Sequence, residues 1–209
     1  MKFYDYAAAP SPRRVRIFLA EKGLSVPTVQ VDLRNGEQFT AAFRAINSDC
    51  TVPVLALDSG TRLTDAIGIC RYFEAMQPEP PLMGATPEEQ GVVEGWQRWA
   101  ERDGFYAVME AFRNWTRAFQ KHALPGPDEY EQIPALAERG RARVARFFER
   151  LDARCAESAF LAGPRYTVAD ITALISVDFA GWAKLNPPDS LAHLKRWYDT
   201  VNARPSAKA

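Results

Sequence analysis

A proline stands directly before a short apolar strand at Val52-Pro53-Val54-Leu55, and this arrangement restricts the fold more than any other feature of the chain. Proline has no backbone N–H, so within sheets it is confined to strand starts, edges and bulges. We predict that the Val52–Pro53 bond is cis, which X-Pro bonds permit at low cost. A cis-proline at a strand start turns the N–H and C=O of the preceding residue outward, where an extended peptide can pair with them.

A helix start follows this strand after a short hairpin. The hairpin turn is predicted at residues 58–60, and the next helix is predicted over 65–76, opening on Asp65 and Ala66. The free N–H groups and the positive dipole end of a helix N-terminus favour a carboxylate. A strand-like edge beside an anion pocket suits a small peptide ligand, so we expect one binding site here.

The composition is that of an ordinary folded protein. The chain has 209 residues, enough for one good core or two small ones, with 47% apolar and 25% charged residues. A formal net charge of zero implies no general attraction to nucleic acid or to an anionic membrane, and no apolar run reaches membrane-spanning length. Three widely spaced cysteines and two histidines predict a reduced, cytoplasmic protein without a disulfide framework or a metal site.

The first part of the chain alternates between strand and helix patterns. Strands are predicted over 2–6, 26–33, 54–57 and 61–63, and helices over 13–22, 39–46 and 65–76. This order predicts a small mixed sheet with helices on both faces. We therefore expect an α/β domain over residues 1–77.

A proline-rich stretch and a change of pattern mark a second domain. Pro78-Glu79-Pro80-Pro81 predicts a linker over 78–85, after which strand patterns largely vanish. Helices are predicted over 87–123 with a bend at Gly104, and over 133–156, 167–183 and 191–202. The second domain, 86–209, is thus expected to be all-helical, with a ligand site in the cleft between the two domains.

Four motifs, in this order, resemble those of the cytosolic glutathione S-transferases. They are MKFYDYAAAPSPRRVRIFLAEKGL at the N-terminus, Asn47 to Pro53, LTDAIGICRYFEAMQPEPPL, and GPRYTVADITAL over 163–174. The resemblance covers nearly the whole chain. It implies a thioredoxin-like domain joined to an all-α domain, a homodimer, glutathione as co-substrate, and a hydrophobic electrophile held between the domains.

The resemblance also implies which residues bind glutathione. Val52, followed by the cis Pro53, would pair its backbone with the cysteinyl unit, and Asp65 would face the γ-glutamyl amino group. Ala66 stands where the family has a serine, so its N–H alone is left for the γ-glutamyl carboxylate. One missing hydrogen bond to a charged group costs roughly 1.5–3 kcal/mol, which would weaken binding. Gln38 matches a position that often contacts the glycyl end.

The catalytic position departs from the family pattern. Ala9 falls where many classes carry a catalytic serine or cysteine. A free thiol titrates near ~8.5 and the thiolate is the nucleophile, so the protein must stabilise the anion. The remaining donors are the N-terminus of the first helix, the backbone N–H of Ala9, and Ser11. The pair Ser11-Pro12 is also typical of a helix N-cap, which is the structural interpretation of this serine.

An aromatic stripe over 105–115 is predicted to be partly core and partly the wall of an acceptor pocket. We expect Phe105, Met109 and Phe112 to line this pocket. Aromatic and thioether side chains suit a hydrophobic substrate and an adaptable site.

Three functions remain open from the sequence. The leading hypothesis is a transferase that conjugates glutathione to a hydrophobic electrophile, in detoxification or in a dedicated catabolic step. The missing hydroxyl at Ala9 also admits a glutathione-dependent disulfide reductase or peroxidase. Ala9 and Ala66 together admit a non-catalytic binding protein that has kept the fold.

Overall fold

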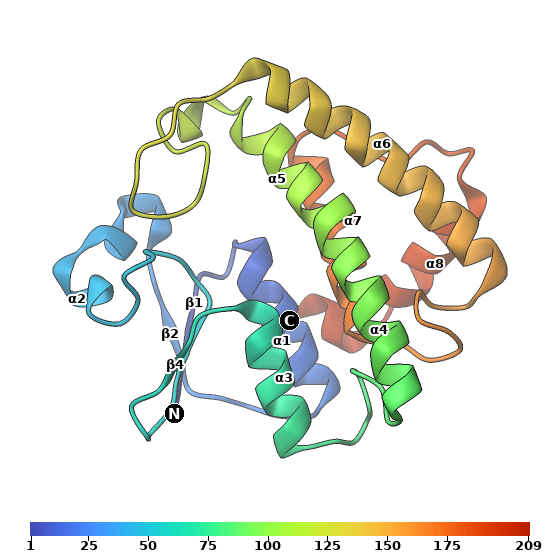
Figure 1. The fold of residues 1–209 in the computed structure, drawn as a ribbon, viewed down its shortest axis with the longest axis horizontal. Helices are drawn as coiled ribbons and strands as arrows, with labels where there is room; N and C mark the ends of the chain where they lie inside the picture. The colour runs from blue at the N-terminus through green and yellow to red at the C-terminus, as the bar shows by residue number, and fades with distance from the viewer.

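The computed structural model describes all 209 residues, a mixed sheet domain followed by a helical domain (Figure 1). The sheet has the strand order β2-β1-β3-β4. The strands are β1 (Lys2–Asp5), β2 (Thr28–Gln30), β3 (Val54–Ala56) and β4 (Arg62–Leu63). β1 runs parallel to β2 and antiparallel to β3, and β3 runs antiparallel to β4. This is the thioredoxin-like arrangement that we predicted.

Helices cover both faces of the sheet. Alternate residues of its strands point to opposite sides, so each face has apolar side chains that pack against helices. The helices of this domain are α1 (Pro10–Glu21), α2 (Ala41–Arg44) and α3 (Ala66–Met76), with 3-10 turns η1 (Leu33–Asn35) and η2 (Glu37–Phe39) before α2. Phe3 and Leu55 are buried in the same apolar cluster as α1 and α3. The adjacent Tyr4 and Val54 pack in a second cluster with Phe43 of α2.

Two elements of this domain are shorter than predicted because local caps end them. β2 stops at Gln30, since the carboxylate of Asp32 accepts hydrogen bonds from two backbone N–H groups and starts the turn η1. The helix predicted over 39–46 has only four residues, and it begins after Thr40, whose hydroxyl accepts from Phe43 N–H.

The second domain is all-helical, as predicted. Its elements are α4 (Pro87–Trp99), the π-helical segment η3 (Ala100–Phe105), α5 (Tyr106–Arg113), the turn η4 (Arg117–Phe119), α6 (Pro134–Glu157), α7 (Val168–Trp182), α8 (Ala192–Asn202) and the turn η5 (Pro205–Lys208). None of the helices combines the length and the apolar character that a membrane crossing requires.

The helix predicted over 87–123 is interrupted around Gly104, where a bend was predicted, and it ends ten residues early, which the sequence pattern did not indicate. Its interruption is η3, which contains Gly104, where an added Cβ would lie 2.8 Å from the ring of Phe147. Its end at Arg113 follows from Asn114, whose side-chain oxygen accepts from Ile133 N–H at 2.9 Å and so joins the chain to the start of α6.

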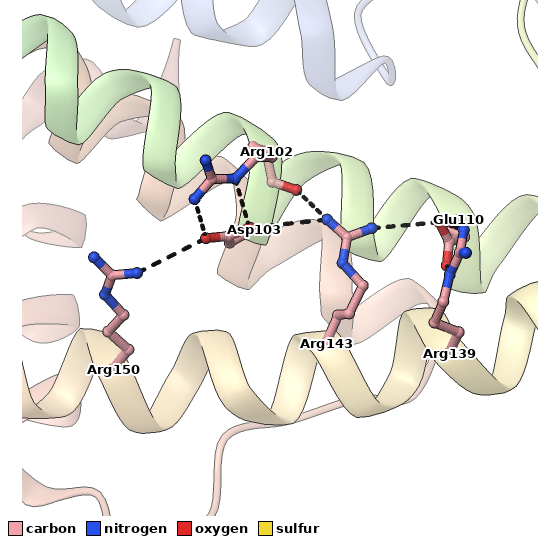
Figure 2. Close-up of polar contacts among 6 residues, drawn as sticks. All are labelled: Arg102, Asp103, Glu110, Arg139, Arg143 and Arg150. Carbon is pink, nitrogen blue, oxygen red and sulfur yellow. Dashed lines mark hydrogen bonds and ion pairs between the residues drawn. The ribbon is translucent and has the colours of Figure 1, made fainter.

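Ion pairs join α6 to the helix that crosses it. Figure 2 shows Arg139 and Arg143 of α6 bound to Glu110 of α5, at 2.9 Å and 3.3 Å. Arg143 and Arg150 also approach the carboxylate of Asp103 in η3, each at 3.9 Å. The arginines on this face of α6 therefore hold neighbouring helices together.

One apolar core extends through both domains. The largest cluster has 39 buried residues and includes Phe18 of α1, Phe147 of α6 and Trp197 of α8. Helix α7 runs through the centre of it, and Ile171, Leu174 and Ile175 are almost fully buried. The sheet domain is thus packed against the helical domain by apolar side chains, which positions the first turn of α1 at the domain interface.

Candidate functional site

Three loops that the sequence singled out meet at one edge of the sheet. Tyr4 pairs with Val54, so the C-terminal end of β1 and the N-terminal end of β3 lie together. Leu63 pairs with Leu55, which brings the end of β4 to the same edge. The first turn of α1 follows β1, the Val52–Pro53 peptide precedes β3, and the first turn of α3 follows β4. All three therefore lie at this edge.

The Val52–Pro53 peptide is cis, as predicted. Neither the N–H nor the C=O of Val52 has a hydrogen-bond partner in the chain. Main-chain groups that are buried are almost always paired, so unpaired ones at a strand start can take an extended peptide. Both main-chain groups of Val52 are thus free, and their pairing with a peptide ligand stays a prediction.

The N-terminus of α3 keeps free donors for an anion. Asp65 is its N-cap, and one carboxylate oxygen accepts from Gly68 N–H at 2.7 Å. The other oxygen of Asp65 has no hydrogen-bond partner and remains available to an ammonium group. The N–H groups of Ala66 and Ile67 are also without partners in the chain. A carboxylate suits this helix end, because its donors and dipole both favour negative charge.

The first turn of α1 begins earlier than predicted, and Ser11 is not its N-cap. The N-cap is Ala9, and Ser11 is the second residue of the helix. The reason lies in the two prolines, since Pro10 fits the first helical position, where no N–H is needed. Ser11 therefore does not cap the helix, and its structural interpretation as an N-cap is wrong.

The backbone N–H of Ala9, which we expected to face the thiolate, is engaged elsewhere. It donates to the carbonyl of Tyr6 at 2.8 Å, and the N–H of Arg13 donates to the carbonyl of Ala9 at 3.4 Å. Pro10 and Pro12 have no N–H. The N–H of Ser11 is the one donor of the first turn that has no partner in the chain.

Gln38 lies beside a loop that comes from the other domain. Its side-chain oxygen is buried without a hydrogen-bond partner. The next residue, Phe39, stacks on His122 with ring centroids 5.7 Å apart. His122 belongs to the loop after α5, which reaches down to the sheet domain near α2 (Figure 1). Gln38 therefore adjoins, through its neighbour Phe39, the point where the two domains meet.

The loop after α5 is held in place by a half-buried arginine. Arg113 donates to the carbonyl of His122 at 2.5 Å, to that of Leu124 at 3.0 Å and to that of Ala123 at 3.3 Å. Burial lowers the pKa of Arg113 to about 10, and the guanidinium stays charged at neutral pH. The contact with Phe39 therefore comes from an ordered loop.

The predicted pocket residues lie on an aromatic cluster whose centre the sequence missed. Phe105 and Phe112 both contact Phe179 of α7, with ring centroids 5.8 Å and 5.4 Å apart. Trp182 of α7 joins them at 6.0 Å from Phe112. Met109 is half-buried and packs against the same core. Phe179 and Trp182 are three residues apart in α7, and this helical spacing is the sequence signal that indicates them.

The aromatic cluster adjoins the first turn of α1. The guanidinium carbon of Arg14 lies 4.3 Å from the centre of the Phe105 ring. Trp182 and Arg13 border a hollow of about 580 Å³, which Phe105, Met109 and Phe112 do not line. An apolar ligand beside these rings would therefore be close to the N-terminus of α1.

The fold and the site define a two-domain protein in which a thioredoxin-like domain, with unpaired main-chain groups at one edge, is packed on a helical domain. Residues 9–76 match the family model "Glutathione S-transferase, N-terminal domain", and residues 104–205 match "Glutathione S-transferase, C-terminal domain". The chain belongs to the glutathione S-transferase family.

Relatives similar to the whole chain support this assignment. The chain is 36% identical over 213 residues to glutathione S-transferase 2 of Saccharomyces cerevisiae, covering 100% of this chain and 88% of the relative. A glutathione S-transferase domain-containing protein of Marinobacter aquaeolei VT8 is 40% identical, with a TM-score of 0.91 and 99% of both chains covered. The crystal structure of Gtt2 from S. cerevisiae is 34% identical, with a TM-score of 0.91 and 100% and 99% covered.

Proposed function

We propose that this protein is a glutathione transferase that joins the sulfur of glutathione to a hydrophobic electrophile. The observation that carries the proposal is a set of unpartnered backbone groups at one sheet edge, on Val52, Ala66 and Ser11. They match, in order, a peptide backbone, a carboxylate and a thiolate. The family membership and the relatives named as glutathione S-transferases support the same reaction.

Glutathione would bind in an extended form along this edge. The cysteinyl unit pairs with the N–H and C=O of Val52, and the γ-glutamyl carboxylate accepts from Ala66 N–H. The free oxygen of Asp65 faces the γ-glutamyl ammonium. The glycyl unit extends toward Gln38, whose buried side-chain oxygen has no partner in the chain and accepts from the glycyl N–H rather than from the carboxylate. Buried polar atoms without partners are uncommon, which supports a ligand contact there.

The reaction needs the thiolate form of glutathione near neutral pH. The N–H of Ser11 and the positive end of α1 stabilise the anion, and the Ser11 hydroxyl adds a second donor. The sulfur attacks an electrophilic carbon of the acceptor, a C–S bond forms, and the displaced group leaves with its electron pair. The acceptor lies against Phe105, Met109 and Phe112, together with Phe179 and Trp182, whose rings contact theirs.

Calorimetric titration with reduced glutathione tests the binding step, with S-methylglutathione as a ligand that cannot form a thiolate. We expect both to bind and only glutathione to release a proton near neutral pH. Absence of binding at millimolar glutathione contradicts the proposal. A chloro-nitro-aromatic acceptor then tests conjugation, and Ser11→Ala should reduce the rate more than it reduces binding.

A second reaction on the same site is the reduction of disulfides or peroxides with glutathione. Ala9 favours it, because the N-cap of α1 carries no hydroxyl or thiol. Parallel assays with a chloro-nitro-aromatic compound, a hydroperoxide and hydroxyethyl disulfide separate the two reactions. A protein that binds glutathione but turns over none of the three, while Ala9→Ser gains activity, would be a non-catalytic binding protein.

We also propose that the protein is a cytoplasmic homodimer and that it serves in detoxification. The proposed domains are residues 1–77 and 86–209, with a linker over 78–85. Three free, buried cysteines support a reducing compartment. Exposed Val92 and Tyr106 on the α4–α5 segment support contact with a second copy. The flexible thioether of Met109 beside aromatic rings suits a range of electrophiles. Light scattering of the purified protein tests the dimer, and a monomeric mass contradicts it.

A further inference from the structure

A buried ion pair connects Ser11 to the helical domain. Arg14 of α1 donates to the carboxylate of Glu101 in η3 at 2.7 Å, and the two side chains are 4% and 5% exposed. A different nitrogen of Arg14 donates to the hydroxyl oxygen of Ser11 at 3.0 Å. The ring of Phe105 covers one face of the guanidinium at 4.3 Å. Three contacts thus fix the position of Arg14.

The contact with Arg14 decides what the Ser11 hydroxyl can do. Arginine has donors and no acceptor, so the hydroxyl oxygen is the acceptor in this bond. The single hydroxyl proton must therefore be donated to some other group. Ser11 is half-buried beside its own unpartnered N–H, so both of its donors are free. A hydroxyl oxygen that accepts from a cation is also a stronger donor, because hydrogen bonds in a chain polarise one another.

We propose that Arg14 is a positioning residue for catalysis: it holds the Ser11 hydroxyl as a donor to the sulfur of glutathione, and Glu101 holds Arg14. The inference rests on the proposed function, since it takes glutathione as the ligand at the first turn of α1. No proton moves along this path. Arg14 and Glu101 act by fixing the Ser11 hydroxyl in its donating orientation before the thiolate arrives, which avoids reorganisation during the reaction.

The Glu101 carboxylate explains how an arginine can be buried at this point. An unpaired charge in a protein interior is costly, and removing one partner of a buried pair is more damaging than never having had the pair. Glu101 is also 3.6 Å from Arg98 of α4, so its charge is shared between two arginines. Arg14 also acts on Cys70 of α3 and Tyr106 of α5, where burial raises each pKa, the charge of Arg14 opposes the rise, and Asp65 adds to it.

The test measures the pKa of the glutathione thiol in the binary complex, by thiolate absorbance against pH and by the pH profile of kcat/KM. We expect Glu101→Gln, Arg14→Lys and Ser11→Ala each to raise this pKa by about one unit, which is a tenfold loss of thiolate at low pH. The KM for glutathione should change little, because the backbone contacts of Val52 and Ala66 remain. Glu101→Gln is nearly isosteric, and circular dichroism confirms that each variant is folded.

A double-mutant cycle separates positioning from general stabilisation. If Arg14 and Glu101 act through the hydroxyl, then Glu101→Gln should have no further effect on the thiol pKa in the Ser11→Ala background. Glu21→Gln is the matched control. It breaks the ion pair of Glu21 with Arg204, at 2.6 Å, which also joins α1 to the helical domain but lies at the far end of the helix. It should lower stability and leave the thiol pKa unchanged.

Three outcomes overturn the inference. They are an unchanged thiol pKa in folded Glu101→Gln, additive shifts in the Glu101/Ser11 double variant, and a shift in Glu21→Gln equal to that in Glu101→Gln. In each case glutathione still binds and conjugation still proceeds, so the proposed function stands. If the parent protein binds no glutathione at all, the proposed function fails and this inference fails with it.

Discussion

Ala9 is an unusual cap for a helix, because its side chain cannot accept a hydrogen bond. Serine, threonine, aspartate and asparagine are preferred there, since their oxygens accept from the second or third N–H of the helix. In α1 the third residue is Pro12, so a capping oxygen could take only the N–H of Ser11. Alanine thus leaves that N–H free, at a cost in stability.

The change Ala9→Ser should raise the free energy of unfolding by about 1 kcal/mol, because the new oxygen caps α1 through Ser11 N–H. Urea unfolding of both proteins measures it. Ala8→Ser, in the exposed loop before the cap, is the control and should stay within ~0.5 kcal/mol of the parent. Equal effects of the two changes would show that the introduced hydroxyl does not cap the helix.

Asp170 shows how one buried carboxylate organises the start of α7. It accepts from Leu161 N–H, Thr167 N–H and the indole of Trp197, each at 3.0 Å. With Thr167 it forms a capping box at the N-terminus of α7. Burial nevertheless raises its pKa from 3.8 to about 6, and the hydrogen bonds offset only part of that rise.

This raised pKa has a consequence for stability. Between pH 3.8 and about 6 the folded protein holds a proton on Asp170 that the unfolded chain has lost, so this group makes stability fall as pH rises through that window. The slope of unfolding free energy against pH should be more positive in Asp170→Asn, which cannot titrate, than in the parent. Identical slopes would contradict the raised pKa.

Helices α5 and α6 approach closely because a glycine stands at their crossing. A Cβ at Gly140 would lie 2.6 Å from the backbone N of Ala111 and 2.9 Å from the carbonyl oxygen of Ala107. Backbone atoms cannot move aside as a flexible side chain can. The ion pairs of Glu110 with Arg139 and Arg143 also depend on this close approach.

Gly140→Ala should therefore destabilise the protein by about 1–3 kcal/mol, the usual cost of overpacking. Gly91→Ala is the matched control, because Gly91 is exposed in α4 and a Cβ there meets nothing within 4 Å. It should raise stability by about 0.5–1 kcal/mol through helix propensity. Thermal and urea unfolding measure both. A neutral Gly140→Ala would mean that the two helices can separate without loss.

Elements with strong local signals were predictable, and contacts between distant elements were not. Helices α6, α7 and α8 lie within two residues of their predicted ends, because apolar periodicity and caps are local properties. The end of α5 at Arg113 depends on Asn114 bonding to Ile133, which no local pattern indicates. The ion pair of Arg14 with Glu101 and the stacking of Phe39 on His122 likewise arise only when the two domains pack.

The largest apolar cluster includes residues of both domains, so the whole molecule should unfold in one step. All five tryptophans lie in the helical domain, at positions 96, 99, 115, 182 and 197, and their fluorescence reports on that domain alone. Cys50 and Cys70 are buried in the sheet domain and Cys155 in α6, so thiol-reagent labelling of Cys50 and Cys70, resolved by peptide mass, reports on the sheet domain. We expect the two probes to give the same urea midpoint. Two separate midpoints would show that the domains unfold independently.

The alternation of Pro10 and Pro12 around Ser11 limits which anions the first turn of α1 can recognise. Phosphate and sulfate bind helix ends through several N–H groups at once, each directed at a different oxygen. This turn offers one N–H, which suits an anion whose charge lies on a single atom, such as sulfur. Inorganic phosphate and sulfate should therefore be poor competitors of glutathione at this position, even at concentrations common in cells.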